Sequence, residues 1–138
     1  VNFHGDLHFE NIIKNKNKIT LLDWREDFSG IKNYGDIYYD LAKINHGLII
    51  DHNIIKKSKF DIIIDKKNIK INFVQSKDNK ICQKIFFEFL KKNNFSVLKV
   101  KILTSLIFLN IAGLHHYPYS FFLYYLGKSF LYKTLTEK

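Results

Sequence analysis

The strand, turn and strand pattern between Asn11 and Asp23 constrains the fold of this chain more than any other feature. Two β-prone runs, residues 12–14 and 19–22, flank a polar cluster at residues 15–18. Short β-prone runs joined by turn-type residues predict a hairpin. If the turn is centred on the polar cluster, we expect Asn11 beside Asp23, with facing side chains about 5 Å apart.

This pairing predicts a site where a carboxamide and a carboxylate share one Mg²⁺ ion. Magnesium prefers oxygen ligands, keeps several waters, and is usually held by one or two protein groups plus the phosphates of a nucleotide. Asp6 lies upstream of this pair. It is then free to orient an attacking hydroxyl and take its proton, as an aspartate does in phosphoryl transfer. The spacing therefore predicts Asp6 as a catalytic residue and Asn11 and Asp23 as metal ligands.

Two segments, HGDLHFEN at residues 4–11 and LLDW at residues 21–24, carry a family resemblance. They resemble the catalytic segment of the aminoglycoside phosphotransferase and choline kinase family, relatives of the protein kinases. The resemblance implies a kinase-like C-terminal lobe and ATP- and Mg²⁺-dependent phosphate transfer to a small-molecule hydroxyl. Trp24 and Arg25 stand where protein kinases have phenylalanine and glycine, which favours a small acceptor over a protein. With its continuation through residues 34–42, the resemblance covers roughly the first third of the chain.

The resemblance also implies supporting roles around the site. His4 would support the backbone near the metal-binding aspartate, and His8, a second catalytic candidate, would place a positive group near the transferred phosphate. Asp36 is expected to cap the following helix, because its side-chain oxygen can accept an unpaired backbone N–H of the first turn. By similarity to the family, Asp40 would lie under the catalytic loop and accept its backbone N–H groups.

The acceptor-binding residues are less defined. Glu10, Trp24, Glu26 and Asp27 are close to the motif in sequence. Acids and an aromatic ring could hold a cationic amine through charge and ring-face attraction. A short acidic loop is also often only solvated, and a sugar hydroxyl fits equally well. The acceptor therefore stays open among sugars, amino sugars and choline-like alcohols.

The chain has no glycine-rich phosphate loop, since its six glycines are scattered singly. In kinase-like enzymes that loop and a strand lysine precede the catalytic loop. Here the motif begins at residue 4. We therefore expect the C-terminal lobe of a longer enzyme, without its N-terminal nucleotide-binding lobe, that binds nucleotide poorly by itself. The alternative is a truncated or non-catalytic kinase-like remnant that acts as a binding module.

Length and periodicity predict one α+β, mainly helical domain over residues 1–138. With 46% hydrophobic residues, 138 residues can bury a substantial core. The catalytic loop and metal hairpin occupy residues 1–25, and residues 34–138 form a helical remainder with a second hairpin at 60–64 and 69–73. Periodicity predicts helices over 34–50, 78–93 and 119–136, and Ser96 is a candidate cap for another that runs to residue 115.

Charge and hydropathy bear on partners and location. Residues 51–138 contain sixteen bases and six acids, against six bases and seven acids in residues 1–50. Such an excess suits nucleic acid or an anionic membrane. Arg25 is, however, the single arginine, and lysines spread over helix faces are usually solvated, so we do not expect a nucleic-acid partner.

The longest apolar stretch, residues 102–114, is shorter than the roughly 20 residues that span a bilayer. A lone Cys82 suits a reducing cytosol, and cytoplasm is expected for an ATP-using enzyme.

Overall fold

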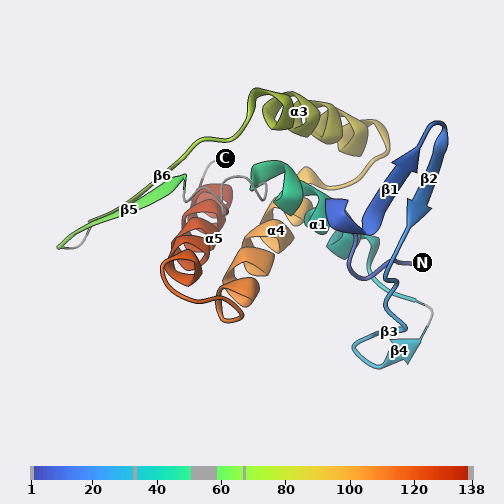
Figure 1. The fold of residues 1–138 in the computed structure, drawn as a ribbon, viewed down its shortest axis with the longest axis horizontal. Coiled ribbons are helices and arrows are strands. Elements are labelled where there is room, and N and C mark those ends of the chain that lie inside the picture. Colours follow the sequence, from blue (N-terminus) through green and yellow to red (C-terminus); the bar gives the residue numbers. More distant parts are fainter. Residues whose placement is uncertain (1, 33, 51–58, 67, 137–138) are drawn as a thin grey trace.

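The computed structural model describes residues 2–32, 34–50, 59–66 and 68–136 (Figure 1). Within these ranges the chain is α+β and mainly helical, as the sequence predicts. The strands are β1 (Ile12–Asn15), β2 (Lys18–Leu21), β3 (Asp27–Phe28), β4 (Ile31–Lys32), β5 (Phe60–Asp65) and β6 (Asn68–Phe73). The helices are the short 3-10 turn η1 (Phe9–Asn11), α1 (Ile37–Ile49), α3 (Lys77–Lys92), α4 (Val97–Ala112) and α5 (Tyr119–Thr136).

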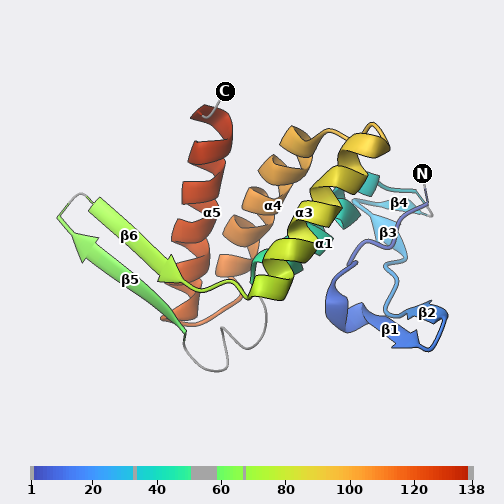
Figure 2. The same cartoon turned by 90° about the horizontal axis from the view of Figure 1, so that it is seen from above.

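The core forms where α4 packs against α5 on one side and against α1 on the other. Phe108, Phe122 and Leu123 are fully buried in a cluster that joins α4 and α5. Leu41 and Leu90 form a second cluster with α4. Figures 1 and 2 show the β5–β6 hairpin extending from one end of this helical body, while the other two hairpins lie at the opposite end. No helix in the described ranges has the length and apolar character needed to cross a bilayer.

Three helices begin where a capping side chain stands directly before them. Asp36 accepts the backbone N–H of Tyr38 at the start of α1, and Ser96 accepts that of Lys99 at the start of α4. Ser76 caps α3 in the same way. Each cap satisfies an N–H that has no partner within its helix, which favours helix initiation at that residue. The predicted positions of Asp36 and Ser96 as caps are confirmed.

Helix α3 buries only part of the apolar face that its periodicity predicts, which is Ile81, Ile85, Phe86, Phe89 and Leu90. Of this face, Phe86 and Leu90 join the cluster with α1 and α4. The exposed fractions of Ile81, Ile85 and Phe89 are 57%, 60% and 48%. Residues 81, 85 and 89 recur at a spacing of four, so they form one stripe along the helix, beside the buried residues.

The hairpins at the N-terminal end differ from expectation in two respects. The β1–β2 turn is centred on the polar cluster and pairs Asn15 with Lys18. The register then pairs Ile12 with Leu21, one residue away from the register that would pair Asn11 with Asp23. The short β3–β4 hairpin was not predicted, because strands of two residues are too short to give a periodic signal.

A chain of buried amide and hydroxyl groups fixes α1 against α3 and α4. The side-chain amide of Asn45 donates to Thr104 Oγ1 at 3.0 Å, and the side-chain amide of Gln83 donates to Asn45 Oδ1 at 2.9 Å. Asn45 and Thr104 are both buried. Buried polar groups are costly unless they are paired, so this chain of hydrogen bonds fixes the relative positions of the helices.

We expect Thr104→Val to lower the free energy of unfolding by about 2 kcal/mol, because it leaves the Asn45 amide without a buried acceptor. Denaturant unfolding followed by circular dichroism measures the change. Thr20→Val on exposed β2 is the matched control and should change stability by less than about 0.5 kcal/mol. Equal effects of the two substitutions would contradict the role given to the Thr104 hydroxyl.

Candidate functional site

The backbone at residues 4 and 5 is attached to α1 by one buried carboxylate. Asp40 Oδ2 accepts the backbone N–H of His4 at 2.7 Å, and Asp40 Oδ1 accepts that of Gly5 at 2.9 Å. Asp40 is only 2% exposed. A buried carboxylate that accepts two N–H groups makes strong, charge-assisted hydrogen bonds. The contact that the family resemblance implies for Asp40 is therefore present.

The same backbone segment lies against the residues that follow β2. The backbone carbonyl of His4 accepts the N–H of Arg25 at 2.9 Å. The His4 ring packs on the Trp24 ring, with centroids 4.9 Å apart. Gly5 has φ of +82°, and a Cβ there would lie 2.7 Å from Arg25 Cβ. Only glycine fits this position, because the backbone is left-handed and the approach leaves no room for a side chain. The supporting position expected for His4 is thus observed.

Asp6 follows this turn and is surrounded by positive groups. Lys43 Nζ lies 2.7 Å from Asp6 Oδ1, and His8 Nε2 lies 3.6 Å from Asp6 Oδ2. Partial burial raises the pKa of the Asp6 carboxyl, but the hydrogen bond and charge of Lys43, with His8 and Arg25 adding, lower it more. The net pKa of Asp6 is below its ordinary value, so the carboxylate is ionised at neutral pH.

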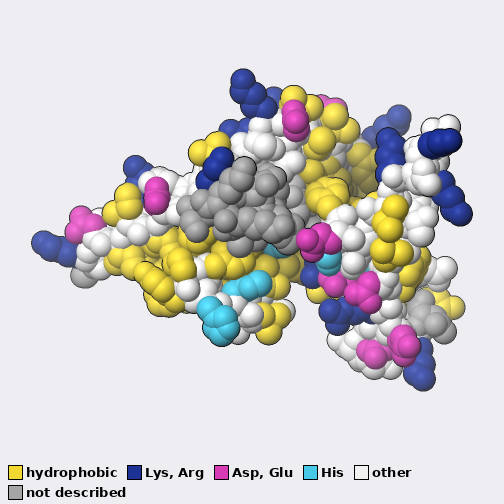
Figure 3. Space-filling view, in the orientation of Figure 1, with side chains coloured by type: hydrophobic (Ala, Val, Ile, Leu, Met, Phe, Trp, Pro, Cys, Tyr) yellow, Lys and Arg dark blue, Asp and Glu magenta, His cyan; other side chains and the backbone are white. Residues whose placement is uncertain are grey.

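The first hollow is the one that Asp6 shares with the residues after β2. It has a volume of about 310 Å³ and is lined by Asp6, Asp23, Arg25, Glu26 and Asp27. Figure 3 shows acidic side chains gathered between the β1–β2 and β3–β4 hairpins, while lysines are spread around the periphery. Asp23 has φ of +55°, a conformation that residues other than glycine rarely adopt and that recurs at functional sites.

Asn11 is not among the residues that line the first hollow, and it does not pair with Asp23 as predicted. The backbone carbonyl of Asn11 accepts the N–H of Leu22 at 2.8 Å, so its strand partner is Leu22 and the expected pairing with Asp23 is wrong by one residue. The Asn11 side chain is buried, and its amide nitrogen donates to the backbone carbonyl of Asp6 at 2.9 Å. This bond leaves Oδ1 as the side-chain atom that a cation could use.

The charged oxygens of the first hollow suit a hard cation that keeps much of its hydration shell. Among the described residues, no three His, Cys, Asp or Glu side chains are arranged to hold a metal ion by themselves. Magnesium does not require such a cluster, because one or two protein oxygens suffice when phosphate oxygens and waters complete the shell. Asp23 shares the hollow with Asp6, as Glu26 and Asp27 do, and Asp23 is the carboxylate that the motif predicts as a ligand.

The second hollow lies on the other side of Asp6. It has a volume of about 400 Å³, and the polar residues among those that line it are Asp6, His8, Glu10, Lys43, His46, Asn79, His115 and Tyr119. Asp6 therefore lines both hollows. The four residues suggested for acceptor binding are separated, because Glu10 lines the second hollow, Glu26 and Asp27 line the first, and Trp24 lines neither.

Sequence reasoning missed Lys43, His46 and His115 in this region. The two histidines lack the spacing of a metal motif and are expected from sequence to be ordinary helix or surface residues. A signal for Lys43 was present, because it follows Asp40 by three residues on α1. Residues three apart share a helix face, so a helix that presents Asp40 to the loop presents Lys43 there too.

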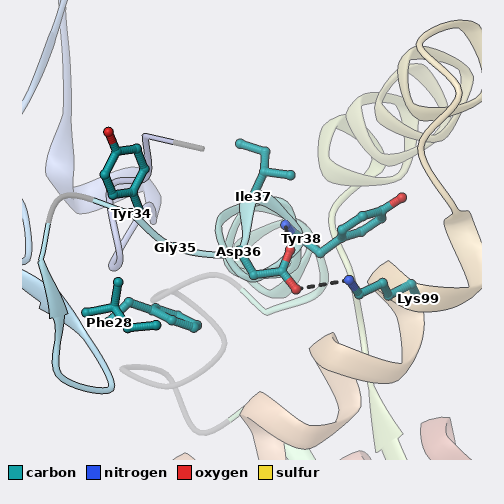
Figure 4. A pocket seen from close by; sticks show the side chains of 8 residues that line it. Phe28, Tyr34, Gly35, Asp36, Ile37, Tyr38 and Lys99 are labelled. Atoms are coloured by element: carbon teal, nitrogen blue, oxygen red, sulfur yellow. Dashed lines mark hydrogen bonds and ion pairs between the residues drawn. The ribbon is translucent and has the colours of Figure 1, made fainter.

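Asp36 links the start of α1 to α4 (Figure 4). Its carboxylate accepts the Tyr38 N–H at 2.9 Å and lies 2.9 Å from Lys99 Nζ. Partial burial raises the pKa of Asp36, but these two hydrogen bonds and the Lys99 charge lower it below its ordinary value. The adjoining cavity, about 480 Å³ in volume, is lined mainly by apolar groups such as Phe28 and Ile37. Asp36 therefore has the structural role expected of it.

We expect Asp40→Ala to destabilise the protein by about 3 kcal/mol, because two buried N–H groups lose a charged acceptor. Chemical denaturation measures the loss, and amide hydrogen exchange at His4 and Gly5 locates it. Glu88→Ala, an exposed acid on α3, is the control and should be nearly neutral. Unchanged exchange at His4 and Gly5 in Asp40→Ala would contradict the attachment described above.

Asp36→Ala should cost about 1 kcal/mol through loss of the cap, whereas Asp36→Asn keeps a capping oxygen and should cost less. The pKa of Asp36 is depressed in the folded state. The stability that the Asp36 charge adds is therefore fully present above the pKa of this group in the unfolded state. It is lost as pH falls through the pKa of the group in the folded state. The difference between wild type and Asp36→Asn should thus shrink below about pH 4, as thermal unfolding across pH can show. A difference that stays constant into acid would oppose this assignment.

No family model matches this chain, and neither a curated protein nor a solved structure matches it. Its function is therefore inferred from the residues around Asp6 and from the chemistry that they support.

Proposed function

We propose that this chain provides the catalytic loop and metal-binding segment of an ATP- and Mg²⁺-dependent phosphotransferase. The acceptor would be a hydroxyl of a small molecule, and the chain would be a kinase-like C-terminal lobe of a longer enzyme. The observation that carries the proposal is that Asp6 and Asp23, from segments on either side of a hairpin, line one hollow. The attachment of the loop backbone to Asp40 supports it, because it fixes Asp6 relative to that hollow.

In this proposal Asp6 orients the acceptor hydroxyl. The hydroxyl oxygen forms a bond to the terminal phosphorus of ATP, the bond from that phosphorus to the bridging oxygen of ADP breaks, and the hydroxyl proton passes to Asp6. A carboxylate with a lowered pKa is a weak base, so its main contribution is to position the hydroxyl. That suffices for phosphoryl transfer, whose loose transition state requires little deprotonation before the bond forms.

Asp23 and Asn11 Oδ1 would hold Mg²⁺ together with water and phosphate oxygens. Bound there, the ion would offset negative charge on the phosphate oxygens. Lys43 and Arg25 are positive groups near Asp6, and both contribute to lowering its pKa. The Asp6 carboxylate by itself would repel a phosphate group, and these positive charges reduce that repulsion.

The test compares three variants of the complete natural protein. Asp23→Asn should weaken Mg-ATP binding at least about tenfold in calorimetry, because a carboxylate ligand is lost. Asp6→Asn should leave Mg-ATP affinity nearly unchanged, yet lower phosphate transfer by about a hundredfold or more. Asp61→Asn, an exposed acid in β5, is the matched control for both measurements.

Full phosphate transfer by Asp6→Asn would refute the catalytic role. If the natural protein binds no Mg-ATP, the alternative of a non-catalytic kinase-like binding module replaces this proposal. Steep salt-dependent binding to DNA or RNA would favour a third class, a lysine-rich nucleic-acid binder.

A further inference from the structure

The second hollow has the size and lining of a small-molecule site. Its volume of about 400 Å³ is within the usual range for ligand pockets. Asp6 reaches it from the loop, Lys43 and His46 from α1, and Asn79 from α3, with Tyr119 of α5 completing the lining. Groups from four separate segments thus converge on one space, which is how polar groups fix the orientation of a bound molecule.

Two polar groups of this lining, Asn79 and Tyr119, are uncharged near neutral pH. Burial raises the pKa of the Tyr119 phenol to about 12, so this hydroxyl remains protonated. The Asn79 amide and the rings of His46 and His115 add donors and acceptors. The Phe9 ring gives an apolar wall and is held close to α1, since a Cβ at Gly47 would lie 2.7 Å from it. Hydrogen-bonding groups beside an apolar ring match the hydroxyls and C–H face of a sugar.

The charges of the second hollow oppose a cationic ligand. Asp6 is already paired with Lys43, whose side chain is only 14% exposed. Glu10 has a side chain 59% exposed and lies 3.9 Å from His8 Nδ1, so solvent weakens its attraction for a ligand in the hollow. An ammonium brought next to Asp6 would meet the Lys43 charge at close range, where like charges repel and partial burial limits the screening by solvent.

We propose that the second hollow binds a neutral polyhydroxy compound, a sugar or polyol, and that Lys43 excludes amines from it while holding Asp6 in position. That this compound is the phosphate acceptor rests on the proposed function. That it binds in the second hollow does not. Of the three acceptor classes open from sequence, the amino sugars and choline-like alcohols are thereby disfavoured.

Binding without nucleotide tests the ligand class. Saturation-transfer NMR would be recorded with sorbitol and with N-methylglucamine, which have similar shapes but differ in charge, and then with glucose and choline. We expect the neutral compounds to bind at least tenfold more tightly than the cationic ones. Lys43→Met should reduce that preference at least fivefold, and Lys128→Met on α5 should leave it unchanged. Equal or tighter amine binding, no binding of any compound, or an undiminished preference in Lys43→Met would overturn the proposal.

A carboxyl titration tests the positioning role of Lys43. Besides Lys43, the charged groups near Asp6 are His8, Arg25 and, across the first hollow, Asp23, Glu26 and Asp27. Lys43→Met should raise the pKa of Asp6, followed by carbon-13 NMR, by about one unit or more, because burial then acts with less opposition. Lys43→Arg retains the charge and should restore most of the shift, and Lys128→Met should have no effect.

An unchanged Asp6 pKa in Lys43→Met would overturn the positioning role. These measurements need neither ATP nor turnover, so their failure is distinguishable from failure of the proposed function. If Asp6→Asn transfers phosphate normally while the binding preference and the pKa shift are found, the phosphotransferase proposal fails and the ligand site stands.

Discussion

The two hydrogen bonds between Asp40 and the backbone of His4 and Gly5 attach the loop that carries Asp6 to α1. A carboxylate that is 2% exposed would be costly to bury without partners, and these N–H groups offset that cost. Asp40 is positioned in turn by the buried apolar side of α1, where Leu41 and Ala42 pack into the core. The helical body thus determines where the loop lies.

The position of Asp6 between two hollows follows from this attachment. The first hollow gathers carboxylates and Arg25, and the second combines the paired charges of Asp6 and Lys43 with hydrogen-bonding groups such as Asn79 and Tyr119. Lys43 affects both, because it lowers the pKa of the one side chain that the hollows share. In the proposed phosphotransferase, an ionised carboxylate with little tendency to bind a proton would align the acceptor hydroxyl.

The helices were predictable because their signals are local. Asp36 and Ser96 identify helix starts from sequence, since a cap depends on the next two or three residues only. The partner of Asn11 was missed by one residue, because register depends on turn geometry that the polar cluster does not specify. The exposed stripe on α3 was missed for another reason: an apolar periodicity shows that a face exists, but not which neighbour covers it.

The site was predictable to the extent that its residues lie in one segment. Asp6 and Asp23 line one hollow and Asp40 lies beneath the loop, as the motif and the family resemblance predict, while the roles of Asp6 and Asp23 stay predictions. His46, Asn79, His115 and Tyr119 come from helices distant in sequence, so only the packing of α1, α3, α4 and α5 brings them together. Long-range packing of this kind leaves no pattern in a single sequence.

Attachment of the loop through backbone N–H groups has an evolutionary consequence. Asp40 accepts only backbone N–H groups in these two hydrogen bonds. The bonds therefore do not depend on which side chains line the second hollow, for example at Phe9 and Glu10. Mutations that reshape the pocket can accumulate without displacing the Asp6 carboxylate. Descendants of one ancestral protein could therefore diverge in what they recognise while keeping the same chemistry.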